Sequence, residues 1–179
     1  MPISGSAGRP QLFMSFTEMN CGGDVMGARH KSNKKPLDQL IAESKDLTGT
    51  VLVVDDNADM VEITKGAIEQ FTPFKVLTAS NGRQALEVLL HHTVDVIVLD
   101  DHMPEMNGPD FFRIIRQRSI YVPVIFLTGS PDDQARQQQL ALGAFDYLEK
   151  PIKARDLILL VTEAAKVMDR IRAILERRA

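Results

Sequence analysis

Short apolar runs alternate with amphipathic stretches along most of this chain. Runs of strand length lie at residues 51–56, 75–79, 94–100, 122–128 and 144–148. Helices are predicted between them, at 58–71, 82–91, 108–118 and 131–142, and a longer one after Pro151. The first, third and fourth runs are mainly apolar up to their last residues, rather than alternating, which is typical of parallel strands covered on both faces. The pattern therefore predicts an α/β fold, a doubly wound five-stranded parallel sheet in (βα)5 order.

The two ends of the chain have a different texture. Residues 1–49 hold six of the eleven glycines and three of the nine prolines, without sustained periodicity, so they are predicted to be a flexible leader. Apolar residues at helical spacing indicate a short helix near 37–47 within this leader. We therefore divide the chain into the leader, a domain over residues 50–165, and residues 166–179 as an extension of the last helix.

The last helix carries an apolar seam at alternating spacings of four and three. Its members are Leu157, Val161, Ala164, Met168, Ile171 and Leu175. The residues in the first half of the seam are expected to pack in the core against the sheet. Those in the second half are expected to lie beyond the edge of the sheet. We expect that second half to contact a partner, either a second copy in a homodimer or a downstream output module.

Composition excludes several classes of protein. With 44% hydrophobic and 25% charged residues, the chain is neither collagen-like nor wholly disordered. Cys21 is the only cysteine, so there is neither an internal disulfide nor a thiolate cluster. The sequence has no apolar run long enough for a membrane span and no signal peptide, so we expect a soluble, cytoplasmic protein without a membrane partner.

The net charge of −3 is unevenly distributed. Residues 50–151 carry eight basic and fifteen acidic residues, and residues 152–179 carry seven basic and four acidic ones. The basic residues of the tail are interleaved with apolar ones, as on the solvated face of a helix. Nucleic-acid binding is therefore the less favoured interpretation of this tail.

Polar residues lie at or just after the carboxyl ends of the predicted strands. They are Asp55, Asp56, Asp100, Asp101, Thr128 and Lys150. In an open parallel sheet these ends meet at one edge, where ligands bind. A glycine-rich phosphate loop is absent after the first run, which disfavours nucleotide binding. Clustered carboxylates require a cation, and Mg2+ suits a small site with oxygen ligands.

A carboxylate in such a site is also a possible nucleophile toward phosphorus. Aspartates can form acyl phosphates, with Lys150 and Thr128 holding the remaining oxygens. The chemistry of the residues alone does not decide whether Asp100 or Asp101 would be the nucleophile.

Four motifs occur in a family order and spacing. They are VVDDN at 53–57, LDDHMPEMNG at 99–108, LTGS at 127–130 and GAFDYLEKP at 143–151. With these motifs, residues 50–165 resemble the receiver domain of two-component response regulators, a flavodoxin-like fold. The resemblance implies that Asp100 is the phosphoacceptor. It also implies that Asp55, Asp56, Asp100 and the backbone carbonyl of His102 bind Mg2+.

The same resemblance implies a switch and its partners. Thr128 and Lys150 would bind the phosphoryl group, Thr128 and Tyr147 would be switch residues, and the Lys150–Pro151 peptide would be cis. The phosphoryl donor would be a phosphohistidine on a histidine kinase or phosphotransfer protein. The domain would catalyse its own phosphorylation and dephosphorylation rather than act as an independent metabolic enzyme. Output would use the surface of the helix at 131–142, the strand at 144–148 and the last helix.

Three alternatives stand beside this interpretation. An aspartate-nucleophile phosphohydrolase would need a DxD sequence, which Asn57 interrupts. A pseudo-receiver interaction module would have lost an acceptor, a metal-binding acid or the lysine, and here all three are present. The chain could also be the receiver fragment of a hybrid histidine kinase or larger regulator.

Overall fold

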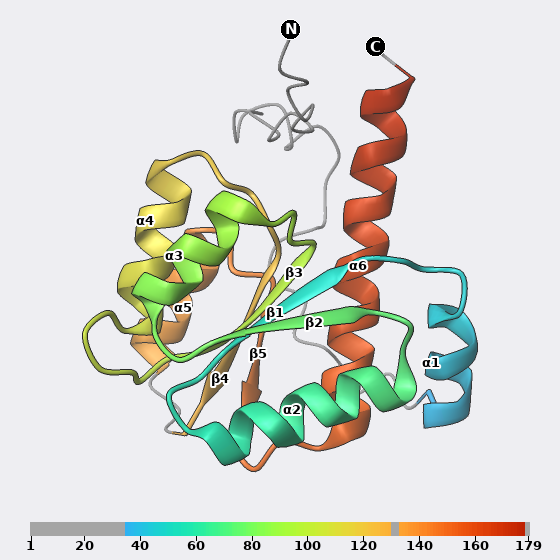
Figure 1. Ribbon diagram of the computed structural model, residues 1–179, viewed down its shortest axis with the longest axis horizontal. Coiled ribbons are helices and arrows are strands. Elements are labelled where there is room, and N and C mark those ends of the chain that lie inside the picture. Colours follow the sequence, from blue (N-terminus) through green and yellow to red (C-terminus); the bar gives the residue numbers. More distant parts are fainter. Residues whose placement is uncertain (1–34, 130–132, 178–179) are drawn as a thin grey trace, which may run out of the picture.

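The computed structural model describes residues 35–129 and 133–177. Its centre is a parallel sheet with the strand order β2-β1-β3-β4-β5 (Figure 1). The strands are β1 (Thr50–Val54), β2 (Lys75–Ala79), β3 (Val96–Asp100), β4 (Val124–Thr128) and β5 (Asp146–Glu149). Every residue of β3 and β4 is buried, which confirms the interpretation of the apolar runs as strands covered on both faces.

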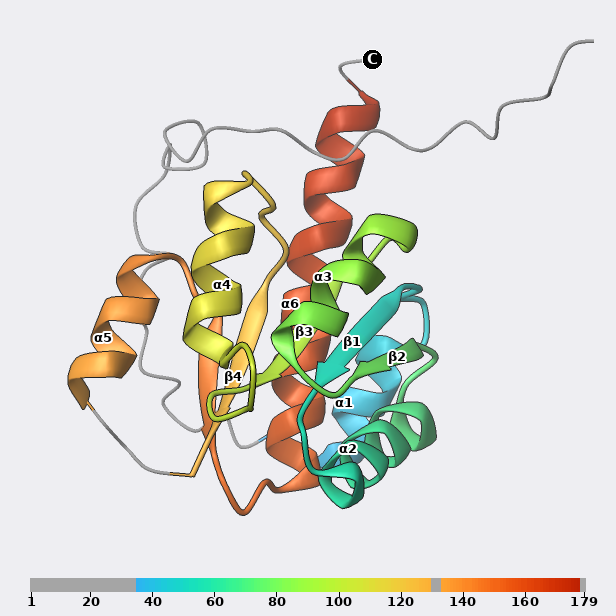
Figure 2. The ribbon, with the colours of Figure 1, turned by 60° about the vertical axis from the view of Figure 1, so that its left-hand side comes forward.

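Helices cover both faces of this sheet. They are α1 (Leu37–Ser44), α2 (Ala58–Phe71), α3 (Gly82–His91), α4 (Gly108–Gln117), α5 (Asp133–Ala141) and α6 (Ala154–Glu176). Figures 1 and 2 show α2 and α6 on one face, and α3, α4 and α5 on the other. Each face has its own apolar cluster, one including Ile68 and Leu157, the other including Phe111 and Phe112. The predicted doubly wound (βα)5 architecture is therefore confirmed.

Asparagine caps begin three of the helices. The side-chain oxygens of Asn57, Asn81 and Asn107 each accept a backbone N–H from the first turn of α2, α3 and α4. These caps satisfy amides that would otherwise lack an intrahelical partner. Because Asn57 and Asn81 come shortly after β1 and β2, these two caps also fix where the chain leaves the carboxyl edge of the sheet.

A partly buried arginine joins three segments at the opposite edge of the sheet. The guanidinium of Arg116 donates to the backbone oxygens of Ile120, Val122 and Gly143 at 2.7, 3.1 and 3.0 Å. It also lies 4.4 Å from the centroid of the Phe112 ring. Burial lowers the pKa of Arg116 to about 10, so the side chain remains charged at neutral pH. The end of α4 and the approaches to β4 and β5 are thereby joined.

The chain is extended beyond the five-strand unit by α1 and by the end of α6. Helix α1 lies within the stretch where a short helix was expected and packs against α6. Residues 1–34 of the predicted flexible leader lie outside the described residues, as do residues 130–132 and 178–179. Within the part that is described, no helix combines the length and the apolar character needed to cross a membrane.

Helix α6 continues past the sheet as expected (Figure 1). The first half of its seam, including Leu157, lies in the core, whereas Met168, Ile171 and Leu175 are partly buried. Arg172 forms an ion pair with Asp95, a buried residue whose other oxygen accepts the Thr50 N–H at 2.7 Å. This pair fixes the extension over the amino edge of the sheet. The partner predicted for the seam stays a prediction.

Candidate functional site

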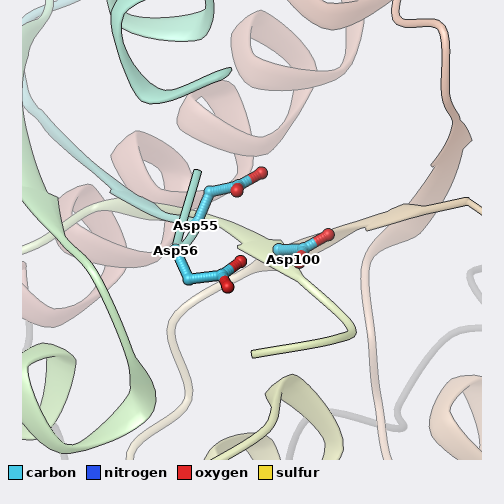
Figure 3. A group of neighbouring side chains, drawn as sticks. All are labelled: Asp55, Asp56 and Asp100. Carbon is cyan, nitrogen blue, oxygen red and sulfur yellow. The ribbon is translucent and has the colours of Figure 1, made fainter. Parts of the chain in front are cut away.

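Three carboxylates meet at the carboxyl edge of two adjacent strands. Asp55 and Asp56 directly follow β1, and Asp100 is the last residue of β3, which pairs with β1. Asp55 and Asp100 are buried, and Asp56 is exposed. One oxygen from each lies within 4.8 Å of the others, and Figure 3 shows the three side chains side by side. The expected acidic cluster is therefore present in the structure.

Lys150 bridges the two buried carboxylates. Its Nζ lies 3.0 Å from Asp55 Oδ2 and 2.7 Å from Asp100 Oδ1. The backbone N–H of Lys150 donates to the Thr128 carbonyl at 2.8 Å, and the Lys150–Pro151 peptide is cis. The ammonium group thus reaches from β5 across β4 to the ends of β3 and β1, because the order of strands puts all four ends on one edge.

The pKa values of this pair reflect burial and mutual attraction. Burial raises the pKa of Asp100, and the hydrogen bond from Lys150 offsets only part of that effect. Burial alone would lower the pKa of Lys150, but its hydrogen bonds to Asp100 and Asp55 and the charges of both carboxylates together outweigh burial, so the pKa is raised. Lys150 therefore stays cationic, and Asp100 is the carboxylate that takes up a proton more readily than an ordinary aspartate.

The loop after Asp100 folds back closely on the strand end. A Cβ on Gly108 would lie 2.2 Å from the Asp100 carbonyl oxygen, so only glycine fits where α4 begins. Met106 of the same loop packs on Gly82 at the start of α3, whose N–H donates to the Met106 carbonyl at 3.2 Å. These contacts hold the loop that carries Asp101 and His102 beside the acidic cluster.

Asp101 and His102 form a pair at the rim of the site. His102 Nδ1 lies 2.7 Å from Asp101 Oδ1, and the His102 side chain is 83% exposed. The hydrogen bond to Asp101 raises the pKa of His102. Asp101 thus points to its neighbouring imidazole, whereas Asp100 points to Lys150.

A groove of about 650 Å³ opens beside the acidic cluster. Its walls include Asp56, Asp101, His102, Thr128, Tyr147 and Glu149. The Tyr147 ring stacks on Phe126 with a centroid separation of 5.1 Å and an interplanar angle of 9°. Its hydroxyl donates to Gln139 Oε1, and burial raises its pKa. The predicted switch residues Thr128 and Tyr147 therefore share one groove next to Asp56.

Two residues around Tyr147 carried no signal in the sequence. Gln139 is the one buried residue of α5 among those described, and Arg136 lies 5.5 Å from the centroid of the Tyr147 ring. Both belong to a polar helix in which no periodicity separates one glutamine from the next. Their contacts with Tyr147 depend on the position of α5 beside β5, which the sequence of α5 does not specify.

The donor set fits a small, hard divalent cation. Carboxylate oxygens that lie within 4.8 Å of one another are close enough to share an ion with ligand distances of about 2.0–2.1 Å. The partial exposure of the set leaves room for the waters that Mg2+ keeps. Asp55, Asp56 and Asp100 are therefore suitable ligands for Mg2+.

The chain belongs to the response regulator receiver domain family, whose model matches residues 51–176. Proteins of this family are phosphorylation-dependent signalling domains of two-component systems, and they generally bind Mg2+ at an acidic pocket. The family predicted from the four sequence motifs is confirmed.

Particular relatives come from several bacteria. The response regulator SaeR of Staphylococcus aureus is 37% identical over 109 residues, which are 61% of this chain and 47% of SaeR. The chain thus matches about half the length of this relative. The receiver domain of the Francisella response regulator 1452 is 31% identical with a TM-score of 0.63, and the match covers 66% of this chain and 97% of that one. A response regulator receiver domain protein from Clostridium thermocellum is 30% identical, with a TM-score of 0.64 and coverages of 69% and 98%.

Proposed function

We propose that Asp100 accepts a phosphoryl group from a phosphohistidine of a histidine kinase or phosphotransfer protein. A carboxylate oxygen of Asp100 attacks phosphorus and the phosphorus–nitrogen bond breaks, with its electron pair remaining on nitrogen. The donor imidazole, already protonated on its other ring nitrogen, leaves as the neutral ring. The observation that carries this proposal is the bridge from Lys150 to Asp100 and Asp55, at 2.7 and 3.0 Å. The bridge holds the Asp100 carboxylate in one orientation and keeps a cation beside the oxygens of an incoming phosphoryl group.

Asp55, Asp56, Asp100 and the backbone carbonyl of His102 would hold Mg2+, which neutralises charge on the phosphoryl oxygens when bound. Lys150 would turn from the carboxylates to the phosphoryl group as a point charge, and the Thr128 hydroxyl would donate a hydrogen bond to it. Asp101 is bonded to His102 and so is not oriented as a nucleophile.

We further propose that phosphorylation shifts the surface formed by α5, β5 and α6. Thr128 and Tyr147 line the same groove, so movement of Thr128 toward a phosphoryl group changes the space beside the Tyr147 ring. The hydroxyl of Tyr147 is bonded to Gln139 of α5, and its ring is stacked on Phe126 of β4. A new position of Tyr147 would therefore alter the packing of α5, which gives the two states different surfaces for a partner.

Uptake of a phosphate mimic tests the acceptor. Beryllofluoride added with Mg2+ and followed by fluorine NMR should bind the wild-type chain and an Asp101→Asn variant, and should not bind an Asp100→Asn variant. Omitting Mg2+ should abolish the signal in all three. A folded Asp100→Asn chain that still binds the mimic would disprove the assignment, and a wild type that binds none would favour a pseudo-receiver module.

The chain matches about half the length of SaeR, so the part of a regulator that produces its response is a separate question from the receiver domain. We propose that this chain acts in the cytoplasm as a receiver that signals through a downstream protein or output domain. A homodimer formed through the extension of α6 would present two such surfaces together. Sedimentation of the chain with and without residues 167–179 tests the dimer, since an unchanged monomer in both cases would exclude it.

A further inference from the structure

Helix α1 is clasped to one face of α6. Lys166 Nζ lies 2.7 Å from Glu43 Oε2, and Lys35 Nζ, just before α1, lies 4.0 Å from Glu163 Oε1 of α6. At the start of α6, Arg155 Nε donates to the Lys35 carbonyl at 2.9 Å. The polar contacts therefore hold α1 at both of its ends, to residues of α6 that are three turns apart.

The face of α6 under α1 has a regular composition. Arg155, Leu159, Glu163 and Lys166 follow one another at spacings of four, four and three, so they lie on one side of the helix. Leu159 is buried in the same apolar cluster as Leu40 of α1. We call these four residues the clasp face. Its apolar centre, Leu159, lies between the cations Arg155 and Lys166, and the carboxylate of Glu163 lies beside Lys166.

Helix α1 presents the complementary pattern. Leu37, Leu40 and Glu43 recur at intervals of three, which places two apolar side chains and a carboxylate along one side. Leu40 is fully buried, Leu37 is partly buried against the same cluster, and Glu43 meets Lys166. Both the apolar and the charged positions of α1 thus match those of the clasp face.

Little besides this docking stabilises α1 as a helix. It has eight residues, its N-cap is Pro36 without a side-chain cap bond, and its last turn has no basic residue. Helices shorter than about 12–15 residues are marginal in water on their own. Helix α1 should therefore be formed only while docked, and undocking leaves the clasp face open to another helix.

We propose that the clasp face is a docking site for an amphipathic helix, that α1 is its built-in occupant, and that a partner helix carrying two leucines and a glutamate at intervals of three residues displaces α1. The partner is recognised by the features that α1 supplies, namely apolar side chains in the cluster that contains Leu159 and a carboxylate beside Lys166. This proposal does not depend on phosphorylation of Asp100.

A labelled peptide with the sequence of residues 35–48 serves as the partner helix. Fluorescence anisotropy measures its binding to the full chain, to a Leu40→Asp variant whose own α1 cannot dock, and to an Ala42→Asp variant. Ala42 is exposed on the same helix, so this control adds the same charge without touching the clasp face. We expect the peptide to bind Leu40→Asp about ten-fold or more tightly than either other chain, and a peptide carrying the same Leu40→Asp change not to bind.

Amide hydrogen exchange of the wild type provides a second readout. The amides of α1 should exchange about ten-fold or more quickly than those of α2, because local undocking precedes global unfolding. Should Leu40→Asp fail to fold, Glu43→Gln replaces it, since this change removes the charge that faces Lys166 and leaves the apolar cluster intact. The proposal is overturned if the folded variant does not bind the peptide, if Ala42→Asp binds it equally well, or if α1 exchanges as slowly as α2.

Discussion

Replacing Lys150 by methionine should destabilise the domain and make its stability strongly dependent on Mg2+. The lysine is 25% exposed, and its ammonium lies within 3.0 Å of two carboxylates whose side chains are almost fully buried. Removing one partner of a fully buried ion pair costs about 3–5 kcal/mol. Because Lys150 is partly solvated, we expect a loss of about 2 kcal/mol in the free energy of unfolding without metal, a value scaled down from that range for solvent screening.

Mg2+ should recover most of this loss. A ligand at about a hundred times its dissociation constant stabilises the folded state by about 2.7 kcal/mol. In Lys150→Met the cation no longer competes with the ammonium for Asp55 and Asp100, so its binding should be tighter than in the wild type. Lys153→Met is the matched control, since Lys153 is an exposed lysine of the same loop.

Urea unfolding with and without Mg2+ measures both effects. The pH dependence of the free energy of unfolding provides a second test. Burial raises the pKa of Asp100 in the folded state, and the variant lacks the lysine that opposes this shift. A carboxyl with a raised folded pKa destabilises the fold when ionised, and this penalty disappears as the pH falls through that pKa. The stability gap between variant and wild type should therefore narrow on acidification. The reasoning is refuted if Lys150→Met is as stable as Lys153→Met, or if Mg2+ stabilises both equally.

Three further predictions concern the scaffold. Arg116→Met should cost about 3 kcal/mol in urea unfolding, because three backbone carbonyls lose a charged donor, and Arg116→Lys should restore only part of it. Thr162→Val should raise the free energy of unfolding by about 1 kcal/mol, since the Thr162 hydroxyl is buried and has no hydrogen-bond partner in the described chain; an unchanged or lower stability would contradict this. Hydrogen bonds from Lys166 and Lys35 lower the pKa of Glu43 to about 2, so the docking of α1 should be fully stabilised above pH 4.5 and lost as the pH falls toward 2; detachment near pH 4.5 in NMR spectra would argue against it.

The order of strands and helices was accessible to sequence reasoning because each element carries its own local signal. The helices at 58–71 and 82–91 have the predicted bounds, since Asn57 and Asn81 supply caps immediately after a strand. The runs at 94–100 and 122–128 overestimated their strands at the amino end. Pro123 is buried like a strand residue, but it has no N–H, and only its carbonyl joins the sheet by accepting from Ile97.

The burial of individual side chains within the predicted elements was harder to predict from the sequence. Ile63 is one of the apolar residues of α2, yet it is 64% exposed in the structure. The covered face of α2 is narrower than the apolar pattern, because Thr64 and Ile68 are the residues of α2 that become buried. In the same way, the pairing of Tyr147 with Gln139 depends on where α5 lies, and α5 contains few apolar residues to specify that position.

The acidic site was predictable to the level of residue identity because parallel strands bring sequence-distant ends to one edge. The bridge that Lys150 forms between Asp55 and Asp100 was not predicted, since the sequence indicated a role for this lysine only in binding the phosphoryl group. In the structure its ammonium occupies the place between Asp55 and Asp100, so the same charge that would receive a phosphoryl group first offsets the repulsion of two buried acids. On phosphorylation, Lys150 would then leave the two carboxylates and bind the phosphoryl group. The energy of that exchange is set by how well Mg2+ replaces the ammonium at Asp55 and Asp100, which is the quantity that the Lys150→Met titration measures.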